Sequence, residues 1–360
     1  MAFVTAQILI DAPASALNNL GTITGKNVDN ATGVKAIRVG REVYPYVSAQ
    51  AFRYWLRGTL EAGTWGWKAS PMYREEKIAY TDANPMKWWD DDLFGYMRAH
   101  SKKSSAQAAR QADASRAGET STTETVTRVS PFRVSTLVSL TSVTVTTDFG
   151  VMARHEGDPV PFEHEFYRTT FQGTISLDLH AAGTFTYVDR TGYLNLDAPR
   201  TEEAKKIGLE EVPSEKAYRL PFKERVERVQ ALFQGLSHLD GGAKQTLHYT
   251  DVSPDVLLLA VTRGGNNVFG HVFGADDRKQ PVVRIDALKE ILTVHRDEFM
   301  SPIYVGWVKG YVDSARTQLE SALDDENGLK PWKDQFIIEH PRTAAERFIS
   351  DLEQHPEWLA

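Results

Sequence analysis

The chain has 360 residues, of which 41% are hydrophobic and 25% are charged, and this balance indicates a globular protein. It contains no cysteine, which excludes disulfide bonds, thiolate zinc sites and a cysteine nucleophile. No apolar run reaches the roughly 18 residues that a membrane-spanning helix needs, and no basic segment precedes the apolar N-terminus, so we expect a cytoplasmic protein without a membrane partner.

The net charge of -7 is unevenly distributed along the chain. Residues 1–60 carry six Lys or Arg and three Asp or Glu, a net charge of +3. Residues 311–360 carry five basic and eleven acidic residues, a net charge of -6. Because salt confines each field to about 8–10 Å, a basic surface near the N-terminus can bind phosphate groups although the total charge is negative. We expect the acidic C-terminal segment to face solvent or another protein.

The first sixty residues predict a strand, a loop and a helix. Residues 3–10, FVTAQILI, are apolar and β-branched, which is typical of a buried strand. Residues 17–40 are rich in Asn, Gly and Thr and predict turns. A helix follows within VSAQAFRYWLRGTL (47–60), with Ser48 as its N-cap. Its apolar face has the spacing i, i+3, i+4, i+7, i+8 and consists of Phe52, Trp55, Leu56, Thr59 and Leu60.

An inserted subdomain is predicted over residues 63–129, where the pattern of the core is interrupted. Its first part is irregular and rich in tryptophan. Its second part, residues 100–127, contains one large aliphatic residue in 28. Such a segment buries too little apolar surface to offset the entropy of ordering, so we expect it to be mobile.

The core resumes with two strand-like segments, residues 132–149 and 165–188. An amphipathic helix follows near residues 222–236, and then a buried strand over 254–262. Without its insertions, the order is βαββαβ, the ferredoxin-like order that RNA-recognition folds share.

We therefore predict an α+β protein with an RRM-like core over residues 1–62 and 130–275 and large insertions. A helical C-terminal region is predicted over 276–360.

Polar donors line one face of the predicted first helix. Gln50, Arg53 and Arg57 fall within about 60° of one another at 100° per residue, opposite the apolar face. Arginine can bind phosphate oxygens bidentately, and the first turn of a helix favours anions. Ser48 adds a further donor there. The alternative is an ordinary solvated face.

Further donors precede the helix. The loop upstream carries three cations, Lys26, Lys35 and Arg38, and its NNLG turn adds Asn18 and Asn19. The helix face contains no Asp or Glu. These features favour a phosphate-binding surface over a solvated face.

Several segments resemble the DevR family of CRISPR-associated proteins, which are backbone subunits of type I-B Cascade in the Cas-seven superfamily. The segments are ALNNLG, NVDN with GVKAIRVGREVYPYVSAQAFRYWLR, HEFYRTTFQGTISLDLHAAGTFTY and GGAKQTLHYTDVSPDVLLLAV. The run S-x-Q-x-x-R-x-x-x-R on the first helix is the most specific part. The resemblance covers residues 3–60 and 130–270 and does not extend to the last ninety residues.

The resemblance implies a non-catalytic protein that polymerises along a guide crRNA. It implies that the protein holds the RNA backbone and presents the guide for pairing with target DNA, so that pairing reads the sequence. Copies of itself and other Cascade subunits are the implied protein partners. The loop DGGAKQTLH (240–248) resembles the glycine-rich RNA-binding loop of the family, with Gly241, Gly242 and Lys244 as its contacts.

The resemblance also implies a hairpin thumb that reaches the neighbouring copy and displaces one nucleotide at regular intervals. By position this thumb spans about residues 145–165, and its tip carries Phe149, Met152, Arg154 and His155. An apolar wedge beside cations suits the displacement of a base. Packing within the hairpin is the alternative role for Phe149 and Met152.

Two other functions remain open at this stage. Related type III subunits cleave target RNA with an acidic residue in the loop after the first strand, and Asp29 occupies a comparable loop. The second of these functions is that of a monomeric RRM-like protein that reads RNA sequence, although such a protein would need aromatic pairs on its sheet. The ten histidines show no ligand spacing, so we expect neither a metal nor a cofactor.

Overall fold

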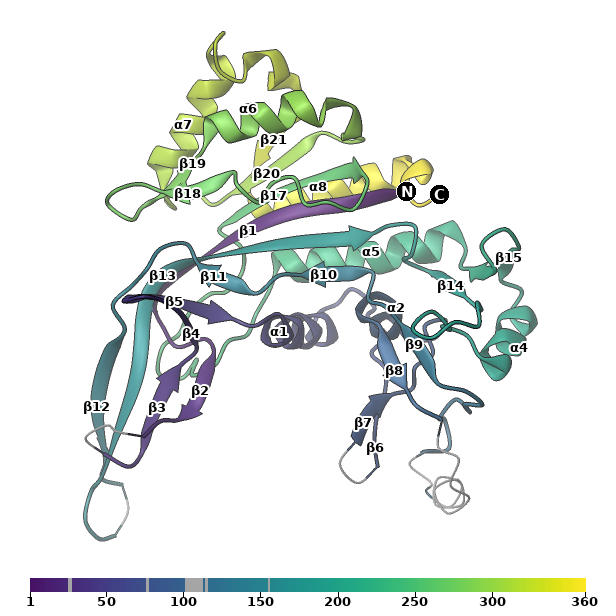
Figure 1. The fold of residues 1–360 in the computed structure, drawn as a ribbon, viewed down its shortest axis with the longest axis horizontal. Coiled ribbons are helices and arrows are strands. Elements are labelled where there is room, and N and C mark those ends of the chain that lie inside the picture. Colours follow the sequence, from purple (N-terminus) through teal and green to yellow (C-terminus); the bar gives the residue numbers. More distant parts are fainter. Residues whose placement is uncertain (25–27, 76–77, 101–112, 114–115, 155) are drawn as a thin grey trace.

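The computed structural model describes residues 1–24, 28–75, 78–100, 113, 116–154 and 156–360. Twelve strands of the described chain form one large sheet with the path β21-β20-β17-β1-β13-β11-β5-β4, from which β10, β12, β2 and β3 branch (Figure 1). These strands are β1 (Ala2–Ser15), β2 (Asn19–Thr22), β3 (Ala31–Val34), β4 (Ala36–Val39), β5 (Glu42–Val47), β10 (Phe132–Val134), β11 (Leu137–Ser139), β12 (Thr146–Met152), β13 (Val160–Asp178), β17 (Val256–Arg263), β20 (Ile303–Trp307) and β21 (Phe336–Glu339).

The remaining elements are short strands and helices. The short strands are β6 (Met72–Glu75), β7 (Ile78–Thr81), β8 (Tyr96–Arg98), β9 (Val126–Arg128), β14 (Thr184–Thr186), β15 (Glu210–Val212), β16 (Ala217–Arg219), β18 (Phe273–Ala275) and β19 (Pro281–Val283). The helices are α1 (Ala49–Ala62), α2 (Trp89–Phe94), α4 (Ala198–Lys206), α5 (Phe222–Ser237), α6 (Ile285–Val294), α7 (Asp313–Asp324) and α8 (Pro341–Gln354). The chain is therefore a mixed α+β protein, as the sequence predicts.

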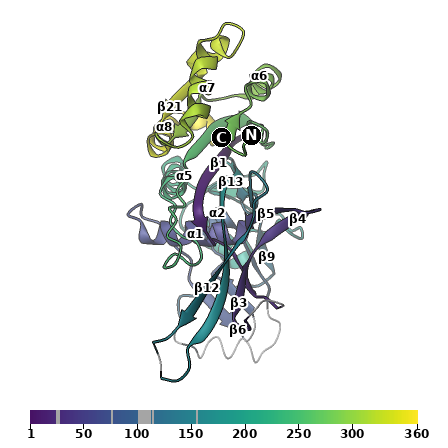
Figure 2. The same ribbon diagram turned by 90° about the vertical axis from the view of Figure 1, so that its left-hand side faces the viewer.

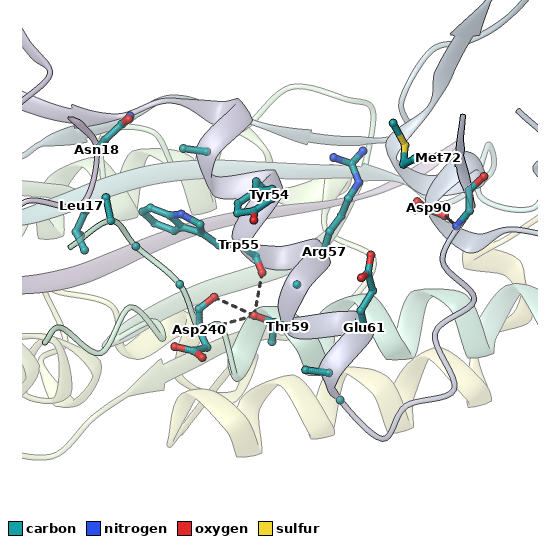
Figure 3. A pocket seen from close by; sticks show the side chains of 18 of the residues that line it. Leu17, Asn18, Tyr54, Trp55, Arg57, Thr59, Glu61, Met72, Asp90 and Asp240 are labelled. Carbon is teal, nitrogen blue, oxygen red and sulfur yellow. Dashed lines mark hydrogen bonds between the residues drawn. The ribbon is translucent and has the colours of Figure 1, made fainter. Parts of the chain in front are cut away.

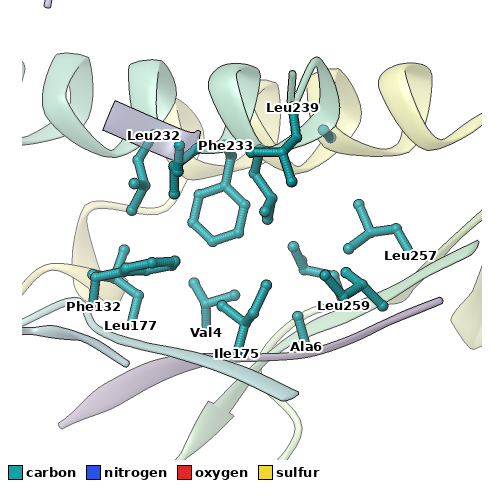
Figure 4. Close-up of a cluster of buried hydrophobic side chains, with 14 of the residues drawn as sticks. Val4, Ala6, Phe132, Ile175, Leu177, Leu232, Phe233, Leu239, Leu257 and Leu259 are labelled. Carbon is teal, nitrogen blue, oxygen red and sulfur yellow. The ribbon is translucent and has the colours of Figure 1, made fainter. Parts of the chain in front are cut away.

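Strand β1 is the centre of the sheet, because it pairs antiparallel with both β13 and β17. Alternate residues of a strand face opposite sides of a sheet, and β1 is apolar on the side that α1, α5 and α8 cover. Figure 4 shows this core, in which side chains of β1, β10, β13 and β17 meet those of α5. Its labelled members are Val4, Ala6, Phe132, Ile175, Leu177, Leu232, Phe233, Leu239, Leu257 and Leu259.

The region over 276–360 is not a separate helical unit. Strands β20 and β21 extend the main sheet, since β20 pairs with both β17 and β21. Helix α8 packs beside α5 through Phe348 and Phe233, whose ring centroids are 4.8 Å apart. Helices α6 and α7 belong to a second apolar cluster on the other side of β17. This arrangement explains why β17 is buried on both faces and reads as a continuous apolar run, VLLLAVT.

Strands β12 and β13 form a long hairpin that projects from the body of the sheet (Figures 1 and 2). Its register runs from the pair Thr146 and Phe166 to the pair Met152 and Val160. Phe149 and Met152 are 57% and 59% exposed, so most of each apolar side chain faces solvent in the single chain. The hairpin lies where the sequence places the thumb, at residues 145–165.

The inserted subdomain draws on more of the chain than residues 63–129. Strands β14, β15 and β16 and helix α4, from 184–219, pack against it. Arg128 of the first stretch donates to Thr184 O of the second at 2.9 Å, and Arg200 donates to Asp82 O at 3.0 Å. Side-chain periodicity carries no information on such long-range pairs, which is why the sequence reveals only one half.

The prediction of a mobile segment over 100–127 does not fit its end. Val126 is fully buried in β9, and Thr120 N donates to Asp82 Oδ1 at 2.6 Å. Residues 101–112, 114 and 115 lie outside the described residues. The polar composition of 116–125 is compatible with order because hydrogen bonds and ion pairs, such as Arg116 with Glu119 at 3.0 Å, hold this part in place.

Candidate nucleic-acid interface

Three segments that are far apart in the sequence meet at the N-terminal end of α1. Ser48 caps the helix, and its Oγ accepts a hydrogen bond from Ala51 N at 3.3 Å. Asn18 Nδ2 lies 3.5 Å from the same Oγ atom, and Asn18 O accepts from Lys35 N at 2.9 Å. The structure thus brings Asn18, Lys35 and Ser48 together, and the adjacent Asn19 has a buried Oδ1 atom without a hydrogen-bond partner in the described chain.

The third segment is the glycine-rich loop, residues 240–248. Ala243 N donates to Leu17 O at 3.1 Å, which ties the loop to the residue before Asn18. Gly242 has φ +105°, and a Cβ atom there would lie 2.7 Å from Leu17 Cδ2, so only glycine allows this approach. Lys244 follows with φ +53°, and burial lowers the pKa of its ammonium group. The hydrogen bond of Ala243 with Leu17 therefore joins the segment that carries Lys244 to the segment that carries Asn18.

Farther along α1, Arg53 contacts the start of β10 and Arg57 contacts the inserted subdomain. Arg53 Nη2 donates to Ser130 Oγ at 3.0 Å and also to Phe132 O. The guanidinium carbon of Arg57 lies 4.5 Å from the ring centroid of Phe94. Burial lowers the pKa of Arg57, and nearby acids offset part of this shift. Both side chains are half-buried. The predicted ladder of freely presented donors is thus occupied in part by contacts within the chain, because the start of β10 and the inserted subdomain cover this face.

The other predicted residues lie at the margins. Gln50 and Arg38 are exposed, the latter on β4. Arg154 is exposed near the hairpin tip, whereas Lys26 and His155 lie outside the described residues. The structure therefore does not gather all predicted residues into one site.

A large cavity lies beneath α1, with a volume of about 1040 Å³ (Figure 3). Helix α1, the glycine-rich loop and the inserted subdomain all contribute to its wall. Tyr54 is a lining residue that the sequence did not single out, although it is 76% exposed. The sequence feature that could have indicated Tyr54 is its position on the helix, one residue after Arg53. The cavity also contains three acids, Glu61, Asp90 and Asp240.

Two histidines connect the glycine-rich loop with the root of the hairpin. The rings of His248 in the loop and His164 in β13 have centroids 5.1 Å apart, and Phe166 stacks on His248 at 5.1 Å. Burial lowers the pKa of His248, and the neighbouring His164 and Lys244 lower it further. The loop therefore packs against the root of the hairpin.

Catalytic features are sparse in this region. Asp29 is exposed in the loop before β3, and the next residue, Asn30, accepts a hydrogen bond from Glu163 N at 3.0 Å through its carbonyl. Within the described chain, no group of three His, Cys, Asp or Glu side chains is placed to hold a metal ion. No helix of the described residues has the length and apolarity needed to cross a membrane.

Comparison with solved structures shows which known fold this chain shares. A chain of a "CRISPR RNA-guided surveillance complex, pre-nicking" shares the fold with a TM-score of 0.52 at 13% identity, covering 97% of this chain and 100% of that one. A chain of a "CRISPR RNA-guided surveillance complex" aligns over 97% of this chain and 99% of its own, with 12% identity and a TM-score of 0.48. No curated protein matches the sequence.

The family follows from the sequence itself. Residues 4–280 match the family described as "CRISPR-associated negative auto-regulator DevR/Csa2". The chain belongs to this family of CRISPR-associated proteins, which confirms the resemblance seen in its motifs.

Proposed function

We propose that the chain is a backbone subunit of a Cascade complex and binds the sugar-phosphate backbone of guide crRNA. The observation that carries this proposal is that the segments carrying Asn18, Lys35 and Lys244 meet beside Ser48, the N-cap of α1. Donors and cations that converge at a helix N-terminus form a site suited to phosphate groups. Arg38 and Gln50 border this site, and Asn19, Gly241 and Gly242 shape it. Arg53 and Arg57 adjoin its far end.

An RRM-like core is consistent with the strand order. Four antiparallel strands, in the order β17, β1, β13 and β10, carry α1 and α5 on one face. In the chain these elements follow one another as βαββαβ. We infer that insertions on this core build the hairpin, the inserted subdomain and the C-terminal region.

The hairpin supports assembly along RNA. More than half of the surface of Phe149 and of Met152 is exposed, and exposed apolar side chains on a projecting hairpin fit a contact with a neighbouring copy or an unstacked base. In this proposal, copies line up on the guide and present it for pairing with target DNA, and the acidic C-terminal segment contacts other subunits. The subunit itself performs no chemical step.

Salt-dependent binding tests the phosphate contacts. We expect Lys35→Ala, Arg38→Ala and Lys244→Ala each to weaken binding of single-stranded RNA to a similar degree for all sequences. Each should reduce the slope of log K against log salt by about 0.7, the value for one contact with a single strand. Lys223→Ala is the matched control, since Lys223 is 87% exposed on α5, away from this site. Unchanged slopes in all three variants contradict the proposal.

Incubation with RNA tests the non-catalytic role. We expect bound RNA to stay intact in the presence of Mg²⁺. Divalent-metal-dependent cleavage that disappears in Asp29→Ala would contradict this role and favour a type III-like activity.

A further inference from the structure

The cavity beneath α1 has the wrong charge for a phosphate group. Its wall contains one guanidinium, that of Arg57, and three carboxyl groups, those of Glu61, Asp90 and Asp240. Arg57 is also turned toward the ring of Phe94. A phosphodiester in this cavity would meet more negative than positive charge, so the backbone is better held at the cationic end, near Lys35 and Lys244.

The same cavity offers an aromatic surface. Tyr54 is 76% exposed on the face of α1 that lines the cavity, and Trp55 forms part of the wall next to it. In the view of Figure 3, Trp55 lies to the left of Tyr54 and Arg57 to its right. An exposed aromatic ring next to a phosphate-binding site is the usual platform on which a base of single-stranded RNA stacks.

The two exposed carboxylates complete the arrangement. Glu61 lies about two helical turns beyond Tyr54. Asp240 is held next to Thr59 because Thr59 Oγ1 donates to Asp240 O at 3.1 Å. In Figure 3 they lie on either side of Thr59. Neither exposed carboxylate is an acceptor for a cation at hydrogen-bond distance among the described ion pairs. They are available as acceptors for the N–H groups of a base.

We propose that this cavity receives one nucleobase of the bound RNA, stacked on Tyr54, with its N–H edge toward Glu61 or Asp240. This inference rests on the proposed function and deepens it, because it adds one base-dependent contact per subunit to a sequence-independent grip on the backbone. The volume of about 1040 Å³ leaves room for a base and its ribose.

Carboxylates set the expected preference. Guanine presents N1–H and N2–H side by side and can satisfy one carboxylate bidentately, whereas cytosine and adenine each offer one exocyclic amino group. Uracil offers a single N–H between two carbonyl oxygens, which the carboxylates repel. We expect guanosine to bind most tightly and uridine most weakly, with a difference of roughly tenfold.

Binding of the four ribonucleosides to the full chain, measured by competitive saturation-transfer NMR, tests the proposal without phosphate groups. Tyr54→Ala should weaken all four, while Tyr54→Phe should retain binding. The double variant Glu61→Gln with Asp240→Asn should reduce the difference between guanosine and uridine. Tyr249→Ala is the matched control, since Tyr249 is 84% exposed but does not line the cavity.

Equal binding of guanosine and uridine, or no binding of either, overturns the proposal. So does a preference that persists in the double carboxylate variant. A parallel measurement with twelve-nucleotide oligocytidine and oligouridine separates this result from the proposed function. If both RNAs bind with the salt slopes described above but without base preference, the result supports binding of the RNA backbone and contradicts the base pocket. If guanosine binds but RNA does not, the result supports the base pocket and contradicts binding of the RNA backbone.

Discussion

Gly241 lies directly against the indole ring of Trp55: a Cβ atom at Gly241 would come within 2.5 Å of Trp55 Cγ. Trp55 is buried in the core face of α1, so the ring cannot move aside without disturbing the helix. This contact is the point at which the glycine-rich loop is fixed to the helix. The position of Lys244 therefore depends on the absence of a side chain at Gly241.

Gly241→Ala should destabilise the protein by about 1–3 kcal/mol, the usual cost of overpacking a core. It should also weaken RNA binding, because the loop that carries Lys244 must shift. Thermal unfolding and RNA titration measure the two effects. Gly270→Ala serves as the control, since a Cβ atom there meets no atom within 4 Å. Equal melting temperatures for both variants would contradict the contact.

Arg53→Ala should lower the free energy of unfolding by about 1.5–3 kcal/mol, because its guanidinium holds Ser130 and Phe132 O against the helix. Arg53→Lys should recover only part of this loss, since an ammonium group lacks the fork that spans two acceptors. Gln50→Ala is the comparison on the same helix, and it should change little because Gln50 is exposed. Urea unfolding is the measurement. A neutral result for Arg53→Ala would mean that its guanidinium is free to bind RNA instead.

Asp92 of the inserted subdomain binds two arginines, Arg128 of the same subdomain and Arg228 of the core helix α5. Its carboxylate is fully buried and lies 2.5 Å from Arg128 Nη2 and 2.7 Å from Arg228 Nη1. Asp92→Ala should cost about 3–5 kcal/mol, because it leaves two buried guanidinium groups without their partner. Arg316→Ala, which removes an exposed pair with Glu320, should cost at most about 0.5 kcal/mol. If chemical denaturation gives similar losses in the free energy of unfolding for both variants, the buried ion pairs contribute no more to stability than an exposed pair.

The pH dependence of stability should reveal Asp91. Burial raises the pKa of its carboxyl from the ordinary value of 3.8 to about 7. The folded state therefore binds more protons than the unfolded state between these values, and stability is present at low pH and is lost as pH rises toward 7. Asp91→Asn should remove this loss, so its melting temperature should exceed that of the wild type by more at pH 8 than at pH 5.

The wild-type protein also contains Asp255, whose pKa is raised by burial to about 6, so only the difference between variant and wild type isolates Asp91. The same gain at both pH values would contradict a raised pKa at this position.

The hairpin tip should matter for assembly and not for the fold. Phe149→Ser combined with Met152→Ser should leave the melting temperature nearly unchanged, since both side chains are exposed. Binding of an RNA long enough for one subunit should also survive, whereas the number of copies on a long RNA should fall. Native mass spectrometry counts the copies. Ile78→Ser, on β7 of the inserted subdomain, is the control, and unchanged assembly of the hairpin variant would remove these residues from the contact.

The sequence predicts local features well. The apolar face of α1 and its cap, Ser48, are confirmed residue by residue because a helical period of 3.6 determines them. The sequence does not predict the partners of Arg53, since Ser130 and Phe132 lie nearly eighty residues away. For the same reason it misses the half of the inserted subdomain that follows β13. Tyr54 escaped notice because a single aromatic residue on a polar face has no periodic signal.

The central position of β1 has a consequence for how the chain is made. The strand ends at Ser15, and its partner β17 begins at Val256, so about 240 residues are synthesised between them. At about 5–20 residues per second, a ribosome needs roughly 10–50 s for that stretch. During this time an apolar, β-branched segment is complete but lacks one of its two neighbours, and such a segment is prone to pair with other chains. The yield of folded protein in a cell should therefore depend on how the nascent N-terminal strand is shielded until its last partner leaves the ribosome.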